Sequence, residues 1–269
     1  MNSLSSPTSP RRPWVGPPAE PHQMQIAERV QAQLRPQASP RLKTLEFAGQ
    51  CLPGRVVGGD FYDFLEPEPG RMALILGDVS GHGVPAALMM AALQASIRSH
   101  YTLSSSPLTP RIESVNRQFF DCTAAEHYAG LFIGEYEDET RRLRYANCGH
   151  VAPLLLRADG SVERLRATGT VLGMFENWRG SLREVTLGHD DTLVLVTDGI
   201  IEASDSYEGE FGELRLLSTI MRFRDLDPPG LIRAIARDVR LSCGRRPFDD
   251  ATIVAARAVG PARTINGGV

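Results

Sequence analysis

The most informative segment of the chain is RMALILGDVSGHGVPAALMMAALQASIR, residues 71–98. Residues 71–79 form a short apolar run that ends in Gly-Asp-Val, which is typical of a buried strand. Residues 84–98 are apolar on all sides, which predicts a buried helix. No residue from 79 to 97 is formally charged, but Ser, Gly, His, Pro and Gln interrupt the run, so we do not expect it to span a membrane.

Short strands separated by turn signals follow this segment about every ten residues. The turn signals are Glu137–Thr140, Asp159–Gly160 and Gly188–Asp191. This spacing is typical of antiparallel hairpins and not of βαβ units, so we predict an α+β domain. The predicted strands are 45–52, 71–79, 127–137, 141–148, 152–158, 182–188, 191–199 and 250–258, and the predicted helices are 22–34, 84–98, 108–122 and 228–241.

The helix predicted over 22–34 has an apolar face and stands between two Pro-rich segments. Ile26, Ala27, Val30 and Leu34 share that face, and Pro36 and Pro40 end the helix. The apolar face needs a partner, which is either the body of the same chain or a second copy of the helix. Residues 1–21 show no apolar periodicity, and we expect them to be disordered.

Composition excludes several classes of function. The 269 residues carry a net charge of −3, and the 29 basic residues include a single lysine, Lys43, so no Gly-Lys-Ser/Thr phosphate loop is possible. A weakly basic N-terminal segment on an acidic body does not indicate a nucleic-acid-binding protein. The four cysteines are far apart, with no Cys-x-x-Cys pair and no apolar signal segment, so we expect reduced thiols and a cytoplasmic location.

Four carboxylates share one feature: each stands where an apolar strand begins or ends, beside glycine or a turn. They are Asp60, Asp78, Asp198 and Asp249. A sheet can hold several acids at one edge in this way, and oxygen-only clusters suit Mg²⁺ or Mn²⁺. A metal would also relieve the repulsion between neighbouring carboxylates. Taken one at a time, each of these residues could instead simply cap a turn.

Five motifs occur in a fixed order along the chain. They are GGDFYDF (58–64), ILGDVSGHGVPAALMM (75–90), YANCGH (145–150), LVLVTDGIIEA (193–203) and FDDATIV (248–254). Together they closely resemble the PPM-type metal-dependent Ser/Thr protein phosphatases, in particular the bacterial SpoIIE-like branch that regulates sigma factors. Each motif alone is weak, but the ordered set is specific and covers about residues 41–258.

The resemblance implies a fold and a metal site. The fold is a four-layer αββα sandwich, with two antiparallel β-sheets packed face to face and flanked by helices. One edge of the sandwich would hold two ions of Mn²⁺ or Mg²⁺, with Asp78 bridging both. The implied ligands are Asp60, Asp78, the backbone carbonyl of Val79, Asp198 and Asp249; candidates for supporting the ligands or contacting substrate are Gly59, Asp250, His82 and Arg55.

The resemblance also implies a domain organisation. It assigns residues 22–36 to a linker helix and 41–258 to the phosphatase domain, which leaves 1–21 as a disordered tail rich in Pro, Ser and Arg and 259–269 as a flexible tail. The helix 84–98 matches an element that acts as a regulatory switch in this branch. Relatives often carry a sensor domain before the linker, whereas here a Pro-rich stretch precedes it. Regulation would therefore come from a separate partner or from a homodimer formed through 22–36, or would be absent.

The chemistry follows from a two-metal site. Asp60 and Asp78 would act through a water whose pKa the ions lower, and the resulting hydroxide would attack phosphorus in line, so no protein nucleophile is needed. The implied substrate is a phosphoserine or phosphothreonine on a small anti-sigma-factor antagonist. His82 could be a general acid, although we favour a role in shaping the helix start. Arg55 could contact phosphate or be solvated, and His150 is expected to be a packed, hydrogen-bonded loop residue.

Two alternatives remain at this point. The chain could be a catalytically silent phosphatase fold that only binds partners, although all four acids are present. It could also be a dinucleotide-binding enzyme, because residues 81–86 match the loose pattern G-x-G-x-x-A. The polar loop that follows the helix, where a second strand should end in an acid, argues against that reading.

Overall fold

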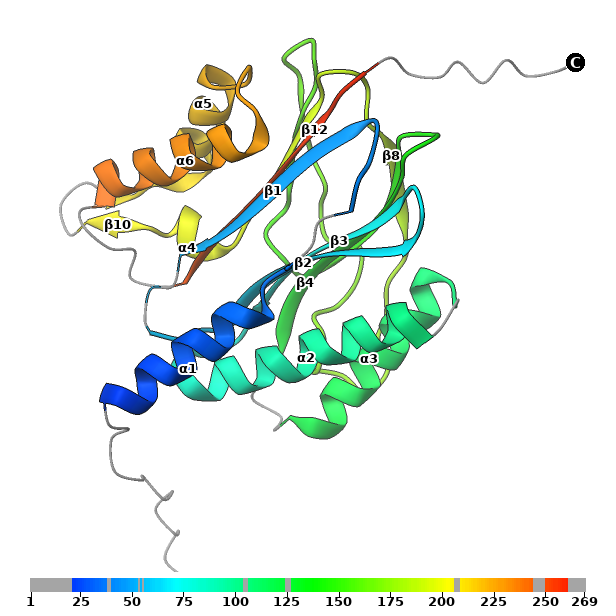
Figure 1. Cartoon of the computed structure of the whole chain (residues 1–269), viewed down its shortest axis with the longest axis vertical. Helices are drawn as coiled ribbons and strands as arrows, with labels where there is room; N and C mark the ends of the chain where they lie inside the picture. The colour runs from blue at the N-terminus through cyan, green and yellow to red at the C-terminus, as the bar shows by residue number, and fades with distance from the viewer. Residues whose placement is uncertain are drawn as a thin grey trace, which may run out of the picture.

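The computed structural model of this chain describes residues 21–37, 40–52, 54, 56–103, 106–123, 127–205, 209–243 and 250–260. Within these ranges the chain forms four layers, in which two antiparallel sheets pack face to face and helices cover both outer surfaces (Figure 1). The prediction of an α+β sandwich with two antiparallel sheets is confirmed. The tails predicted at the two ends lie mostly outside the described residues.

Ten of the described strands form the two five-stranded sheets. One sheet has the order β1 (Leu45–Leu52), β12 (Ala251–Ala258), β9 (Thr192–Val196), β6 (Leu154–Leu156) and β7 (Val162–Arg164). The other has the order β2 (Asp60–Glu68), β3 (Arg71–Val79), β4 (Ala129–Glu137), β5 (Arg142–Cys148) and β8 (Arg183–Thr186). A short hairpin pairs β10 (Ser204–Asp205) with β11 (Gly209–Glu210).

Strand β3 shows why the central strands are apolar along their whole length. Its residues Met72, Leu74 and Leu76 face the other sheet, whereas Ala73 and Ile75 face the helices. Side chains alternate between the faces of a strand, so a strand covered on both faces needs apolar residues at every position. The same alternation in β9 and β12 completes the core between the sheets.

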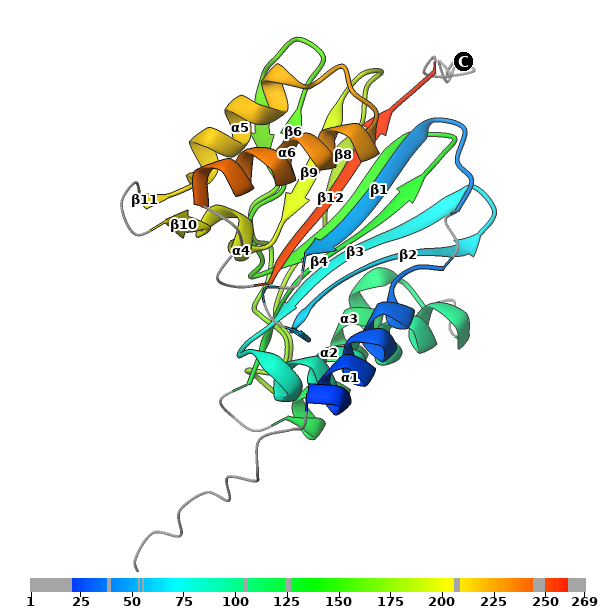
Figure 2. The same cartoon turned by 60° about the vertical axis from the view of Figure 1, so that its left-hand side comes forward.

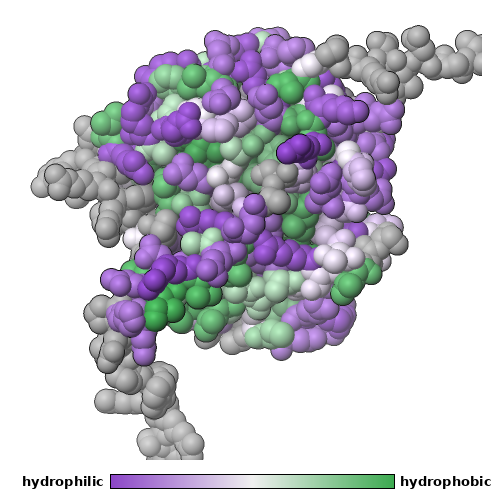
Figure 3. All heavy atoms as spheres, viewed as in Figure 1, coloured by the Kyte–Doolittle hydropathy of each residue, from purple (hydrophilic) through white to green (hydrophobic). Residues whose placement is uncertain are grey.

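Three helices cover the outer face of the β2–β8 sheet: α1 (Pro21–Leu34), α2 (Gly83–Leu103) and α3 (Leu108–Cys122) (Figure 2). The prediction that the helix over 84–98 is buried on all sides is wrong. Its Met90, Leu93 and Ile97 are buried, but Leu88 is 68% exposed. Figure 3 shows apolar side chains gathered on the surface along α2, beside α1. The helix lies in the outermost layer, so only one of its faces can reach the sheet.

The opposite sheet is covered by α5 (Gly212–Arg222) and α6 (Pro228–Cys243), while the short helix α4 (Asp198–Ile201) follows β9 directly (Figure 2). Apolar side chains of α5 and α6 pack on β9 and β12. The turns predicted at 137–140, 159–160 and 188–191 lie between β4 and β5, β6 and β7, and β8 and β9.

The architecture excludes the dinucleotide reading. The residue pairings of both five-stranded sheets are antiparallel, so the Gly81–Ala86 segment does not belong to a βαβ unit. Cys51, Cys122 and Cys148 are free thiols. Across the ranges that the structure describes, no helix combines the length and the hydropathy needed to cross a bilayer.

Candidate active site

Strand pairing brings together the first two of the predicted acids. Asp60, the first residue of β2, lies directly opposite Asp78, near the end of β3. Opposed residues of an antiparallel pair project to the same face with their Cβ atoms about 5 Å apart. Asp60 is 5% exposed. Burial raises the pKa of Asp60 well above its usual value, and the neighbouring charge of Asp78 raises it further.

Two threonines that the sequence analysis missed hold Asp60 in place. The Thr197 hydroxyl donates a hydrogen bond to Asp60 Oδ2 at 2.7 Å, and the Thr252 hydroxyl also bonds the carboxylate. The Thr252 backbone N–H donates to Thr197 Oγ1 at 2.9 Å, and both threonines are fully buried. The two sheets therefore meet at this carboxylate. Thr197 directly precedes the predicted ligand Asp198, and Thr252 lies two residues after Asp250; this closeness in sequence was the signal that could have indicated them.

Asp198 reaches the same edge from the other sheet. It begins α4 directly after β9, and it lines a cavity of about 340 Å³ together with Asp78. The remaining wall residues include the glycines Gly81, Gly130 and Gly149, which add no side chains to the space. A cavity of this volume is at the lower end of the range for small-molecule sites and admits a phosphorylated side chain.

Gly59 allows the backbones of two strands to approach closely behind the acids. The Val79 N–H donates to the Gly59 carbonyl at 3.3 Å, and a Cβ atom on Gly59 would lie 2.5 Å from the Val79 carbonyl oxygen. That distance is shorter than any side chain tolerates, so glycine is required here. The Val79 carbonyl, predicted as a ligand, is thus next to Asp78 and against Gly59.

Asp250 supports the loop that leads into Asp60. Its Oδ2 accepts a hydrogen bond from Gly59 N–H at 3.0 Å, and its Oδ1 accepts one from Gly54 N–H at 2.9 Å. These contacts fit a supporting position for Asp250. Asp249 and Arg55, the other two candidates in these loops, lie outside the described residues.

The two histidines of the motifs have different environments. His82 is exposed and directly precedes α2. His150 is buried and hydrogen-bonded: its Nδ1 donates to the Val151 carbonyl at 2.9 Å, and its backbone N–H donates to Asn147 Oδ1 at 2.8 Å. Burial lowers the pKa of His150 to about 4, so its ring is neutral at neutral pH.

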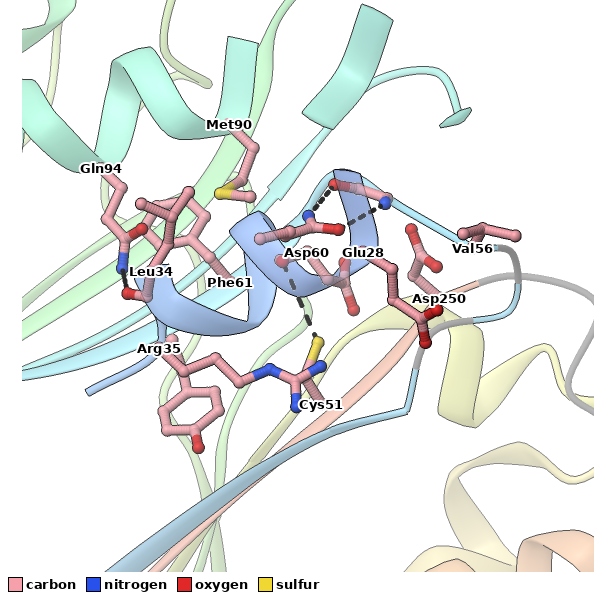
Figure 4. A pocket seen from close by; sticks show the side chains of 13 residues that line it. Glu28, Leu34, Arg35, Cys51, Val56, Asp60, Phe61, Met90, Gln94 and Asp250 are labelled. Atoms are coloured by element: carbon pink, nitrogen blue, oxygen red, sulfur yellow. Dashed lines mark hydrogen bonds between the residues drawn. The ribbon is translucent and has the colours of Figure 1, made fainter. Parts of the chain in front are cut away.

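The back of the site is closed by α1 (Figure 4). The Gln31 side chain forms two hydrogen bonds with the backbone of Gly58, donating to its carbonyl at 2.7 Å and accepting from its N–H at 3.2 Å. Gln94 of α2 donates to the Leu34 carbonyl at the C-terminal end of α1. A cavity of about 30 Å³ remains between α1 and Asp60. The helix therefore packs on its own chain and contacts the loop that carries the site.

A half-buried cysteine, Cys51, lies beside Asp60 on this side. Cys51 Sγ is 3.0 Å from Thr252 Oγ1, and Figure 4 shows the Arg35 guanidinium next to it. Burial and the nearby Asp60 carboxylate raise the pKa of Cys51 to about 12, so the thiol stays protonated. The thiol is thus a polar neighbour of the site.

The acids fit divalent cations by their chemistry. They are oxygen donors only, and the facing pair Asp60 and Asp78 repel each other unless a proton or a cation lies between them. Among the residues for which the structure gives a placement, no three His, Cys, Asp or Glu side chains are grouped so that they could hold an ion. The predicted set includes Asp249, which is not among them.

Comparison with known proteins places the chain in a family. The model of the family described as "Stage II sporulation protein E (SpoIIE)" matches residues 68–259. Protein IcfG of Synechocystis is 27% identical over 225 residues, and phosphoserine phosphatase RsbU of Bacillus subtilis is 26% identical over 155 residues. These alignments cover 74% and 56% of this chain but only 35% and 45% of the relatives, so the chain matches less than half the length of either.

Solved structures give the same result for the fold. The RsbU and RsbW domains of Rv1364c from Mycobacterium tuberculosis superpose with a TM-score of 0.73 at 25% identity, covering 87% of this chain and 68% of that one. The SiaA-PP2C domain of Pseudomonas aeruginosa superposes with a TM-score of 0.75 at 23% identity, covering 88% and 95%. The matched family model, together with the paired acids and the sandwich fold, shows that this chain belongs to the SpoIIE family of PPM-type phosphatase domains.

Proposed function

We propose that this chain is a Mn²⁺- or Mg²⁺-dependent phosphoserine and phosphothreonine protein phosphatase. The observation that carries the proposal is that strand register pairs Asp60 with Asp78. Asp78 in turn lines the same cavity as Asp198. A buried carboxylate that faces a second, half-buried one is costly without a cation, and sites of this kind are usually functional. Membership of the SpoIIE family and the name of RsbU, a phosphoserine phosphatase, support the same reaction.

In this proposal the metal ligands are Asp60, Asp78, Asp198, Asp249 and the carbonyl of Val79, serving two ions. When bound, the ions supply an activated water and neutralise charge on the phosphoryl oxygens. The chain's own residues do the positioning: Thr197 and Thr252 orient the Asp60 carboxylate, and Asp250 fixes the loop before it. Gly59 supports the ligands by close backbone approach, and Arg55 and His82 are the candidates for substrate contact.

We further propose the substrate and the setting. The substrate would be a phosphorylated Ser or Thr on a small anti-sigma-factor antagonist, and the enzyme would act in the cytoplasm. Support comes from the names of the relatives, because RsbU is a phosphoserine phosphatase and the Rv1364c structure combines an RsbU with an RsbW domain. Free thiols at Cys51, Cys122 and Cys148 agree with a reducing compartment.

A homodimer through α1 is also part of the proposal. Ile26 and Val30 of α1 are 44% and 54% exposed, although Leu34 packs on the core of its own chain. Val84 and Leu88 of the neighbouring helix α2 are also exposed, at 40% and 68%. A second copy of this surface would bury side chains that one chain leaves in water.

Activity in defined metal conditions tests the proposed reaction. A phosphoserine peptide and p-nitrophenyl phosphate are incubated with the full chain in Mn²⁺ and in chelator, for the wild type and Asp78→Asn. We expect hydrolysis only by the wild type in Mn²⁺. An inactive wild type under all these conditions would support the silent, partner-binding alternative. If the wild type is active, Asp78→Asn can serve as bait for phosphorylated partners from the source cell.

A further inference from the structure

The cavity that holds Asp78 and Asp198 has an apolar side. Tyr128 and Val171 both line it, and Tyr128 is 40% exposed. Tyr128 is fixed to the strand that carries Asp78, since its N–H donates to Ser80 Oγ at 3.0 Å and its carbonyl accepts from Ser80 N–H at 2.9 Å. The backbone of an aromatic residue that lines the cavity is therefore fixed to this strand.

Two further apolar side chains continue from this point. An antiparallel bridge between Ala129 and Leu172 places Gly173 opposite Tyr128, and Met174 and Phe175 follow Gly173 in the chain. Gly173 has a positive φ of +82°, a backbone conformation that favours glycine. Met174 is 42% exposed and Phe175 51% exposed. We call Tyr128, Val171, Met174 and Phe175 the apolar rim.

The segment that displays the rim is held in one conformation. Asn116 of α3 is fully buried; its side chain accepts a hydrogen bond from Gly173 N–H at 3.0 Å and donates to the carbonyls of Phe175 and Glu176 at 2.9 and 3.0 Å. Trp178 is also buried, and its ring N–H donates to the Thr170 carbonyl at 3.0 Å. Met174 and Phe175 are thus presented to solvent by a segment anchored on both sides.

Exposed apolar side chains on an anchored segment are typical of a binding surface, because folding gains nothing from their exposure. Two of its members, Tyr128 and Val171, line the cavity that, under the proposed function, receives the phosphorylated side chain, so the rim begins at that cavity. We propose that the apolar rim binds the protein substrate by an apolar residue next to its phosphoserine or phosphothreonine. This inference rests on the proposed function and adds a sequence preference to it. The occupant is the substrate polypeptide, since a small phosphate ester that fills the cavity does not reach Phe175.

The test compares phosphorylated substrates that differ in the residues next to the phosphorylated one. The full chain in Mn²⁺ is assayed with p-nitrophenyl phosphate and with two phosphoserine peptides, whose flanking residues are Leu in one and Ser in the other. We expect wild type to prefer the Leu peptide by about tenfold or more in kcat/KM. The double variant Met174→Ser, Phe175→Ser should lose that preference and keep the wild-type rate on p-nitrophenyl phosphate. Leu103→Ser, an equally drastic change at an 84% exposed leucine at the far end of α2, should keep both.

The outcomes separate this inference from the proposed function. Equal rates on the two peptides for wild type, or an unchanged preference in the double variant, would overturn the docking inference alone. A wild type that hydrolyses none of the three substrates would overturn the proposed function, and the inference with it. A double variant that changes from dimer to monomer would identify a second copy of the chain as the occupant and would also overturn it. Thermal denaturation of each variant confirms that the fold is intact.

Discussion

Asp60 is the residue at which the contacts of this site converge. It is paired in register with Asp78, accepts hydroxyl hydrogen bonds from the opposite sheet, and follows the Gly59 amide that Asp250 holds. The threonine hydroxyls lower the pKa of Asp60, against the larger effects of burial and Asp78, which raise it. A carboxylate held in this way is oriented before any ligand arrives.

Replacing Thr197 by valine removes the donor without changing the shape of the side chain. Asp60 Oδ2 and the Thr252 N–H then lose a partner in a fully buried place, so the free energy of unfolding should fall by about 1–3 kcal/mol. Urea denaturation in metal-free buffer measures it. Thr197→Ser, which keeps the hydroxyl, should stay close to wild type; equal stability of Val and wild type would refute the role assigned to this bond.

The burial of His150 predicts how the free energy of unfolding changes with pH. Its pKa is about 4 in the folded chain, against about 6.5 in the unfolded chain, so the unfolded chain binds a proton first as the pH falls. Its contribution to stability is complete above pH 6.5 and is lost progressively toward pH 4. Between pH 7.5 and 5, the wild type should therefore lose about 2 kcal/mol more than His150→Asn, which has no titrating group here.

Denaturant titrations of both proteins at the two pH values check this in metal-free buffer. The remaining titratable groups are common to wild type and His150→Asn, so the difference between the two losses isolates His150. The same pH dependence in both proteins would contradict a buried, neutral ring.

At the scale of elements, α1 is connected to the loop that carries the site. Gln31 bonds both backbone groups of Gly58, and Gln94 and Arg98 of α2 donate to the Leu34 carbonyl that ends the helix. Arg98 and Gln94 also bind the buried carboxylate of Asp63 on β2. The helix, the loop and the first strand of the sheet thus share one set of hydrogen bonds.

Substituting Gln31 by leucine should release this loop. The substitution removes both hydrogen bonds to Gly58, so the Gly58 N–H loses its protection and the loop opens more often. Amide hydrogen exchange in residues 54–60 should therefore accelerate by about fivefold to tenfold. Hydrogen–deuterium exchange with mass spectrometry measures this. Gln33→Leu, at an exposed position of the same helix, is the matched control. Exchange unchanged in Gln31→Leu would show that α1 does not hold the loop.

The elements differ in how well the sequence predicts them. β3, β9 and β12 are buried on both faces, and their continuous apolar runs were sufficient for prediction. β2 was not predicted, because its buried positions include Asp60 and Asp63, whose partners come from elements distant in sequence. α5 was not located, because only a few of its residues, such as Leu216 and Ile220, are apolar and buried. The exposed face of α2 was missed because apolar residues alone do not reveal which layer covers them.

The candidate site, like the fold, could be predicted only in part from the sequence. Acids at strand ends beside glycine are local signals, and they indicated Asp60, Asp78 and Asp198. The resemblance to a family then assigned these acids to one metal site. The pairing of Asp60 with Asp78 depends on strand register, and the support from Thr197 and Thr252 depends on how two sheets meet. Neither is encoded in a single segment. Asp249 and Arg55 remain predictions, because they lie outside the described residues.

At the scale of the whole molecule, the exposed apolar residues of α1 and α2 predict self-association. Val30→Asp together with Leu88→Asp introduces charge into both helices of that surface and should convert a dimer into a monomer of 29.4 kDa. Light scattering after size exclusion measures the mass. Leu214→Asp, at an 80% exposed position of α5, should leave the dimer intact. A wild type that is already monomeric would remove the dimer from the proposal.

The central claim is that the carboxylates gathered at one edge of the sandwich bind divalent metal. Calorimetric titration of Mn²⁺ into the metal-free chain tests it most directly, with Asp78→Asn beside wild type and Asp159→Asn, an acid in an exposed turn, as the matched control. We expect two ions to bind to wild type and to the control, and affinity to fall by about 100-fold or more in Asp78→Asn. Mn²⁺ binding that is the same in Asp78→Asn and wild type would contradict the account.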